Sequence, residues 1–212
     1  MAAHIALLGD STLDNGAYTA GEPDVVSHLR ALLPAESRAT LLAVDGSTIA
    51  DLPRQLADVA PDVTHVVVSI GGNDALLNSD VLTGRAASVT GALQAVGERA
   101  AGFERAYRRM TDRVLSLARR TIVCTIYNGN FEDDWGHAAR LGLTMFNDPI
   151  LRVAFERGLD VIDLRLVCAE PADYANPIEP SGQGGRKIAR AIAAAVLRVD
   201  AGTRLSRVFG HQ

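Results

Sequence analysis

Five short apolar runs, separated by segments of helical periodicity, constrain the fold of this chain most strongly. The runs lack the alternation of strands that face water on one side, as expected for strands buried on both faces. They are residues 4–8, 40–44, 65–70, 121–126 and 159–162. Strands that alternate with helices form parallel sheets covered by helices on both sides. We therefore expect an α/β fold built on a parallel sheet.

The segments between the runs carry the signals of helices. Thr48-Ile49-Ala50-Asp51 has the pattern of a capping box, so a helix is expected to begin near Thr48. The other expected helices are residues 23–33, residues 103–120, a helix after Gly136 that is interrupted at Asp148-Pro149, and a final helix with Ile188, Ile192 and Val196 on its core face. Residues 165–185 are expected to form a long irregular stretch.

Composition narrows the class of protein. The 212 residues suffice for one well-filled domain, which we place at residues 1–200, with a C-terminal tail at 201–212. A net charge of −4 argues against nucleic acid or an anionic membrane surface as the partner, and no apolar run is long enough to cross a bilayer. Neither a basic leader nor metal-ligand spacing around Cys124 and Cys168 is evident. We expect a cytoplasmic protein with no metal, no cofactor and a small-molecule partner.

Chemistry-bearing residues follow three of the predicted strands. Gly9-Asp10-Ser11 follows the first, Asp45-Gly46-Ser47 the second and Gly71-Gly72-Asn73-Asp74 the third. In a parallel sheet these turns share one edge, which is where such sheets bind ligands. Acyl transfer needs a nucleophilic oxygen and donors for the developing oxyanion. Ser11 can supply the first, and the Ser11 N–H, the Gly46 N–H and the Asn73 amide can supply the second.

The three motifs, in this order, resemble those of the SGNH hydrolase superfamily, the GDSL-type esterases and lipases. Ser11, Gly46 and Asn73 match the family's residues in type, order and spacing, and the resemblance spans nearly the whole chain. It implies a three-layer α/β/α sandwich with a five-stranded parallel sheet. It also implies a serine esterase that forms an acyl-enzyme on Ser11.

The chain departs from the family pattern near its C-terminus. Where the family has Asp-x-x-His, this chain has Asn176-Pro177-Ile178-Glu179. Glu179 can replace the histidine as general base, if burial raises its pKa, or it can be a structural residue at a site that has lost its activity. Another candidate base is His137, which follows the fourth strand, although a solvated loop position is the simpler interpretation.

Two further residues have simpler structural interpretations. Asp10 is expected to accept a local hydrogen bond that holds the serine turn. Asn73 can alternatively cap the segment that follows it, as Asn often does. Two classes of function therefore remain: an acyl hydrolase acting on a small ester, and a non-catalytic binding or regulatory domain that keeps the pocket without the base.

Overall fold

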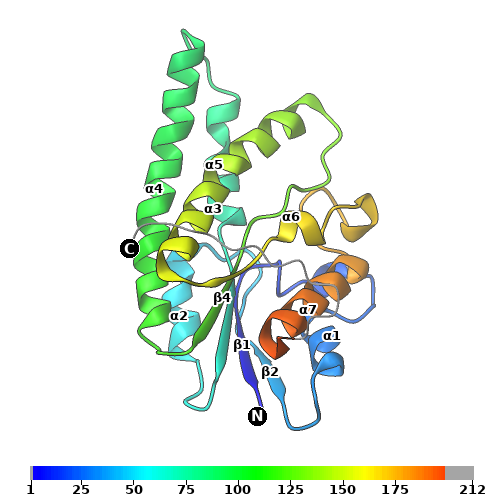
Figure 1. The fold of residues 1–212 in the computed structure, drawn as a ribbon. Helices are drawn as coiled ribbons and strands as arrows, with labels where there is room; N and C mark the ends of the chain where they lie inside the picture. Colours follow the sequence, from blue (N-terminus) through cyan, green and yellow to red (C-terminus); the bar gives the residue numbers. More distant parts are fainter. Residues whose placement is uncertain (1, 199–212) are drawn as a thin grey trace.

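A twisted parallel sheet forms the centre of the molecule in a computed structural model that describes residues 2–198 (Figure 1). Within these residues the sheet has five strands in the order β2-β1-β3-β4-β5, and every pair is parallel. The strands are β1 (His4–Gly9), β2 (Arg38–Leu41), β3 (His65–Ser69), β4 (Arg120–Cys124) and β5 (Asp160–Ile162). The predicted parallel sheet is confirmed, and the carboxyl ends of β2, β1 and β3 lie side by side.

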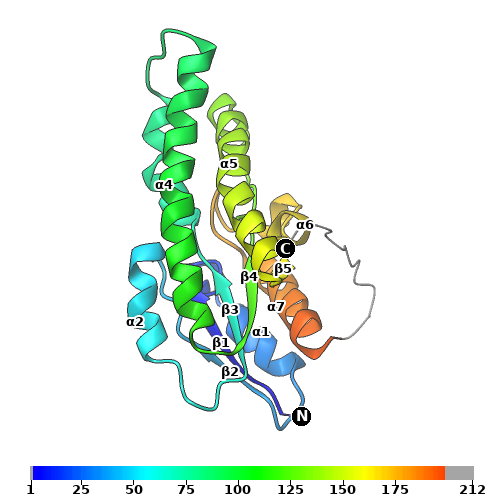
Figure 2. The ribbon, with the colours of Figure 1, turned by 60° about the vertical axis from the view of Figure 1, so that its left-hand side comes forward.

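Helices cover both faces of this sheet (Figures 1 and 2). One face carries α1 (Val25–Leu32) and α7 (Gly182–Leu197), and the other carries α2 (Leu52–Ala57), α4 (Val89–Leu115) and α5 (Asp134–Arg157). Shorter elements connect them: η1 (Gly16–Tyr18), η2 (Ile49–Asp51), α3 (Gly72–Leu77), η3 (Ser79–Leu82), α6 (Leu164–Val167) and η4 (Pro171–Asp173). The expected three-layer sandwich is thus confirmed.

Strand β1 shows why both faces need a helical layer. Ile5 and Leu7 belong to the core beneath α1 and α7, whereas Ala6 and Leu8 belong to the core beneath α4 and α5. All four side chains are fully buried. Burial of a large aliphatic side chain contributes about 1.5–3 kcal/mol, so a central strand of this kind is stable only with apolar layers on both sides.

Several predicted boundaries were wrong, each for a local reason. Strand β2 begins and ends earlier than residues 40–44, because the N–H groups of Leu42 and Ala43 both donate to the Leu7 carbonyl and end the regular ladder. Helix α4 begins at Val89 rather than near 103, since the Ser88 hydroxyl caps it by accepting from the Gly91 N–H at 3.0 Å. The stretch 165–185 includes most of α6, all of η4 and the start of α7 at Gly182.

Helix α5 runs through Pro149 without the expected interruption. A proline inside a helix costs about 3 kcal/mol because it removes a hydrogen bond and crowds the preceding turn. Burial of the helix face on both sides of the proline, by Phe146, Ile150, Val153 and Ala154, outweighs that cost.

The outer halves of α4 and α5 extend past the carboxyl edge of the sheet as an arm (Figures 1 and 2). With 27 residues, α4 is about 40 Å long at 1.5 Å per residue. The inner halves are joined by ion pairs, among them Arg108 with Glu156 at 2.5 Å and Arg157 with Asp112 at 2.7 Å. In residues 2–198 no helix has both the length and the apolar character needed to cross a membrane.

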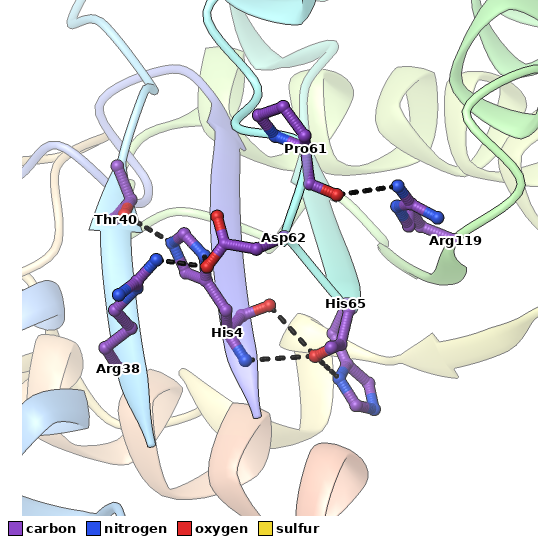
Figure 3. Close-up of polar contacts among 8 residues, drawn as sticks. His4, Arg38, Thr40, Pro61, Asp62, His65 and Arg119 are labelled. Carbon is purple, nitrogen blue, oxygen red and sulfur yellow. Dashed lines mark hydrogen bonds and ion pairs between the residues drawn. The ribbon is translucent and has the colours of Figure 1, made fainter. Parts of the chain in front are cut away.

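The amino edge of the sheet is fastened by a polar cluster around His4 (Figure 3). The His4 ring lies 3.1 Å from an Asp62 oxygen through Nδ1 and 2.8 Å from the Thr40 hydroxyl through Nε2. Arg38 pairs with the same Asp62, and Arg119 donates to the Pro61 carbonyl at 2.8 Å. This cluster therefore uses His4 structurally, at the opposite edge from Ser11.

Candidate active site

The serine turn depends on a glycine that allows two strands to approach closely. Gly9, the last residue of β1, has φ +142°, and a Cβ there would lie 1.7 Å from the Ser69 carbonyl oxygen on β3. The Asp10 N–H donates to that same carbonyl at 3.1 Å. One residue later the turn places Ser11, whose side chain is almost buried, on this support. The Asp10 carboxyl accepts from the Thr12 N–H at 3.0 Å, as the turn requires.

Gln55, on α2, fastens the serine turn to the turn after β2. Its amide accepts from the Gly9 N–H at 2.7 Å and donates to the Gly9 carbonyl at 2.8 Å. The same nitrogen donates to the Ser47 hydroxyl at 3.2 Å. Because buried Gln55 satisfies both backbone groups of Gly9, it holds the turn that carries Ser11 in a fixed position relative to the sheet. Sequence reasoning missed Gln55, because a single polar residue in a short helix carries no signal of its partners.

Asn73 links the turns after β2 and β3. Its Nδ2 donates to the Ser47 carbonyl at 2.9 Å, which leaves the second amide hydrogen for a ligand. The alternative that Asn73 caps α3 was wrong, because the N-cap residue is Gly71 and no side chain caps this helix. Gly46 lies exposed beside Ser47 with φ +78°. Within residues 2–198 the N–H groups of Ser11 and Gly46 have no hydrogen-bond partner, so both remain available as donors.

Asn176 shapes the loop that presents Glu179. Its side-chain oxygen accepts from the N–H groups of Ile178 and Glu179, both at 2.9 Å, and so forms a tight turn. Tyr127, in the loop after β4, donates its hydroxyl to the Ile178 carbonyl at 2.6 Å. Asn176 therefore acts on Glu179 through its backbone, whereas the family's aspartate would face an imidazole.

A buried asparagine binds the serine loop to the Glu179 loop. Asn15 is fully buried, and its Nδ2 lies 3.2 Å from the Pro180 carbonyl and 3.3 Å from that of Ser181. Its oxygen accepts from the Val25 N–H at 3.0 Å. From the other side, buried Asp173 pairs with Lys187 of α7 at 2.7 Å. The two halves of the site are thus held together across the whole length of the chain.

Glu179 is nearly buried and lines the same pocket as Ser11. Burial raises the pKa of the Glu179 carboxyl above its ordinary 4.5, a side-chain interaction with the Ser11 hydroxyl lowers it in part, and the Asp45 charge raises it again. Within residues 2–198 the Glu179 Oε2 atom has no hydrogen-bond partner. The Glu179 carboxyl therefore has one oxygen that no described group satisfies.

Asp10 is a second perturbed carboxyl at the same place. Burial raises the pKa of Asp10 to about 7, against the lowering effect of its bonds to Thr12. The charges of Glu179 and Asp74 add smaller increases. Carboxyls with shifted pKa values gather at functional sites more often than elsewhere.

One pocket contains Ser11, Asn73, Asp10 and Glu179, with about 900 Å³ of empty space including its open mouth. Away from the serine its walls come from α3, η3 and the outer parts of α4 and α5, and they are mainly apolar. These walls include Ile70, Leu76, Val81, Leu82, Val96, Trp135, Gly142, Leu143 and Phe146. Gly46 does not line this pocket and lies next to it.

The histidines in the described part of the chain lie elsewhere. His137 is exposed in the first turn of α5 and is not brought to the pocket. His4 and His65 belong to the amino edge, and His28 lies on α1. His211 and the rest of the predicted tail lie outside the described residues.

The layered parallel sheet, with these turns at its carboxyl edge, is the architecture of the α/β/α acyl hydrolases. Residues 7–187 match the model of the GDSL-like lipase/acylhydrolase family, and the chain belongs to this family. Family membership supports an acyl hydrolase. No curated protein sequence matches the chain.

Solved structures similar to this chain share its fold. An extracellular lipase from Streptomyces rimosus matches with a TM-score of 0.71 and 16% identity, covering 92% of this chain and 100% of that one. An acetylxylan esterase from Geobacillus stearothermophilus matches with a TM-score of 0.66 and 19% identity, covering 92% of this chain and 94% of that one. An α/β-hydrolase enzyme from the metagenome of Lake Arreo, Spain, matches with a TM-score of 0.67 and 25% identity, covering 92% of this chain and 96% of that one.

Proposed function

We propose that the protein is a serine esterase that cleaves a small ester through an acyl-enzyme on Ser11, with Glu179 as the general base. The observation that supports the proposal is the Glu179 carboxyl, which lines the same pocket as Ser11 and has one oxygen unpartnered among the described residues. A buried acid without a partner is costly to keep unless it has a task. Glu179 occupies the position at which the family pattern has histidine.

The steps follow from these positions. Ser11 Oγ attacks the ester carbonyl carbon while Glu179 takes the hydroxyl proton. The C–O bond to the alcohol then breaks, and the proton passes from Glu179 to the departing oxygen. Water attacks the acyl-serine in the same way and releases the acid. The N–H groups of Ser11 and Gly46 and the free amide hydrogen of Asn73 are the donors for the oxyanion.

The apolar walls of the pocket support an acyl group with a hydrocarbon chain. Most of the lining side chains beyond Asn73 are aliphatic or aromatic, and the lining extends from Ser11 to residues of the outer parts of α4 and α5. Burial of each methylene contributes about 0.8 kcal/mol, so affinity should grow with chain length until the pocket is full. We infer an acyl chain of medium length.

One experiment tests the nucleophile directly. The wild type should give a single fluorophosphonate adduct by intact-mass analysis and should cleave p-nitrophenyl esters of four to ten carbons. Ser11→Ala should lose both the adduct and the cleavage. Labelling that persists in Ser11→Ala would point to another nucleophile.

The non-catalytic binding domain is the competing function, and it is favoured by the positions of the four histidines of residues 2–198 away from the pocket. It requires that the wild type cleave no ester across pH 5–9 and form no adduct, while still binding a fatty acid in the apolar pocket. The same assays therefore separate the two functions.

A further inference from the structure

We propose that Asp74 is a positioning residue of the esterase, which holds the turn that carries Gly46 at a fixed distance from Asn73. Its carboxyl does so through the N–H group of Ile49. The inference rests on the proposed function and adds to it a residue that does not line the substrate pocket. Its effect belongs to the transition state, because only there must both oxyanion donors meet one negatively charged oxygen.

Two consecutive residues of α3 hold the turn after β2 by two hydrogen bonds of opposite direction. Asn73 Nδ2 donates to the Ser47 carbonyl at 2.9 Å. Asp74 Oδ2 accepts from the Ile49 N–H at 3.1 Å. With one bond alone the turn could pivot about that bond, whereas two bonds, two residues apart along the turn, also fix its orientation. The turn and α3 are therefore joined at a fixed angle.

Gly46 depends on such bonds, because packing does not hold it. It is exposed, and a Cβ there would meet no atom within 4 Å in the described part of the chain, its two chain neighbours aside. Its φ of +78° belongs to a turn that is closed by a bond of 3.1 Å from the Ser47 N–H to the Val44 carbonyl. The Val44 N–H donates to the Gly9 carbonyl at 3.1 Å. One end of the turn is thus held by β1 and the other by α3.

The Ile49 N–H needs an acceptor from outside its own helical turn. It lies at the start of η2, where the N–H groups have no partner within the helix. The capping box satisfies the N–H groups of Thr48 and Asp51, and Asp74 of another helix satisfies that of Ile49. Because Ile49 is buried, loss of this acceptor would leave its donor unsatisfied or shift the turn.

A simpler interpretation of Asp74 is an acidic residue in the first turn of α3, where a negative charge favours the helix dipole. The direction of its side chain supports a more specific role. Oδ2 binds a residue 25 positions away, outside its own helix, and no side chain caps α3. A dipole effect needs no particular partner, whereas the bond to Ile49 joins two turns of the candidate site.

Asp74 lies outside the pocket that contains Ser11. Asn73 lines that pocket, whereas Asp74 lines a separate groove between α2 and α4, together with Met110 and Arg109. This groove has about 640 Å³ of empty space including its open mouth. Two neighbours in the sequence therefore face different spaces, and Asp74 affects the reaction only through the turn that it holds.

The kinetics of two variants with p-nitrophenyl hexanoate test this role. Asp74→Ala should lower kcat by about ten-fold or more, because a small displacement of an oxyanion donor weakens binding of the transition state. Its KM should stay within about two-fold of the wild type, since the ground state does not need both donors. Asp74→Asn keeps an oxygen that can accept from the Ile49 N–H, and its kcat should stay within about three-fold of the wild type.

Two controls separate positioning from general loss of stability. Thr64→Ala removes a hydroxyl that accepts from the His4 N–H at 3.0 Å, at the amino edge of the sheet. It should lower the Tm by about 2–4 °C, as Asp74→Ala should, but leave kcat unchanged. Hexylboronic acid mimics the charged tetrahedral state, because Ser11 Oγ adds to its boron while the hydroxyl proton passes to Glu179. Asp74→Ala should weaken its inhibition by about ten-fold or more and inhibition by hexanol by less than about two-fold.

The order of two conservative variants decides the test if Asp74→Ala does not fold. Asp74→Asn has the right length without the charge, and Asp74→Glu has the charge with one methylene too many, so the first should be the more active. The reverse order, or an Asp74→Ala variant with the kcat of the wild type, overturns the positioning role and leaves the esterase standing. A wild type that cleaves no ester and forms no fluorophosphonate adduct overturns the esterase itself, and this role with it.

Discussion

Glu179 stands where the family pattern has histidine, and this replacement predicts how kcat/KM depends on pH. A base must be ionised to accept the serine proton, and the pKa of Glu179 lies above 4.5. We therefore expect kcat/KM to rise with pH through a limb above 4.5, as Glu179 loses its proton. Glu179→Gln should lower kcat by about 10²-fold or more, since an amide cannot take the proton. A pH titration of both proteins with p-nitrophenyl hexanoate measures the effect.

Restoring the family pattern gives the control for this prediction. Asn176→Asp with Glu179→His should recover activity near neutral pH, because an aspartate orients an imidazole and stabilises its charged form. Equal activity of the wild type and Glu179→Gln would show that Glu179 is not the base.

The shifted pKa of Asp10, in the candidate active site, makes the free energy of unfolding depend on pH. Its pKa is about 7 in the folded protein against 3.8 as the ordinary value, so the folded state holds the proton more tightly. Stability from this group is fully present below pH 3.8 and is lost as pH rises through 7. Compared with Asp10→Asn, the wild type should lose on the order of 4 kcal/mol of unfolding free energy between pH 4 and 8.

Urea unfolding at steps of half a pH unit measures this difference. Asn at position 10 can still accept the bond from Thr12, so the turn should persist. Asp58→Asn serves as the control and should follow the wild type at every pH. Parallel curves for the wild type and Asp10→Asn would show that Asp10 is ionised throughout.

At the scale of elements, we expect Gly142, which lines the pocket from α5, to control the length of acyl chain that the pocket accepts. A Cβ at this position would meet only Leu82 Cδ2, at 3.9 Å, so alanine fits. Gly142→Ala should raise the free energy of unfolding by up to about 1 kcal/mol through helix propensity and leave the chain-length profile unchanged. Gly142→Leu should fill the pocket and lower kcat/KM for decanoyl more than for butanoyl esters, about ten-fold in the ratio.

A chain-length series of p-nitrophenyl esters reads out both variants. The alanine variant separates the effect of helix stability from that of pocket volume. An unchanged profile in Gly142→Leu would mean that the acyl chain lies elsewhere.

Elements also show what the sequence could predict. Strand ends in a parallel sheet meet at one edge, so the shared edge of Ser11 and Asn73 followed from the prediction of a parallel sheet. Gln55 and Asn15 could not be predicted, because their partners are backbone groups 46 and up to 166 residues away. The passage of α5 through Pro149 was missed, since the outcome depends on tertiary burial that local propensity does not contain.

At the scale of the whole molecule, the arm divides into a packed base and a loose tip. The buried side chains of α4 begin at Ala100, so none of residues 89–99 is buried among the described residues. Val89 and Leu93 are among the exposed apolar side chains. We expect amide hydrogens of residues 89–99 to exchange much faster than those of residues 103–114.

Hydrogen exchange with mass spectrometry measures this contrast and its response to a ligand. Acylation of Ser11 by a long-chain fluorophosphonate should slow exchange in residues 76–82 and 89–99, because Leu82 and Val96 line the pocket. A short-chain fluorophosphonate is the control and should protect only the serine turn. Identical protection by both reagents would contradict an acyl site at the arm.

The hydrogen bonds from Asn15 to the Pro180 and Ser181 carbonyls determine when the site can form during synthesis of the chain. The ribosome completes the serine turn early, but its carboxylate partner emerges some 165 residues later. At 5–20 residues per second, this interval is on the order of 10–30 s. During that time a nascent chain can form β1 and its neighbours but cannot complete the pocket that Ser11 and Glu179 line. On the proposed function, we therefore expect esterase activity to begin only after α7 has docked.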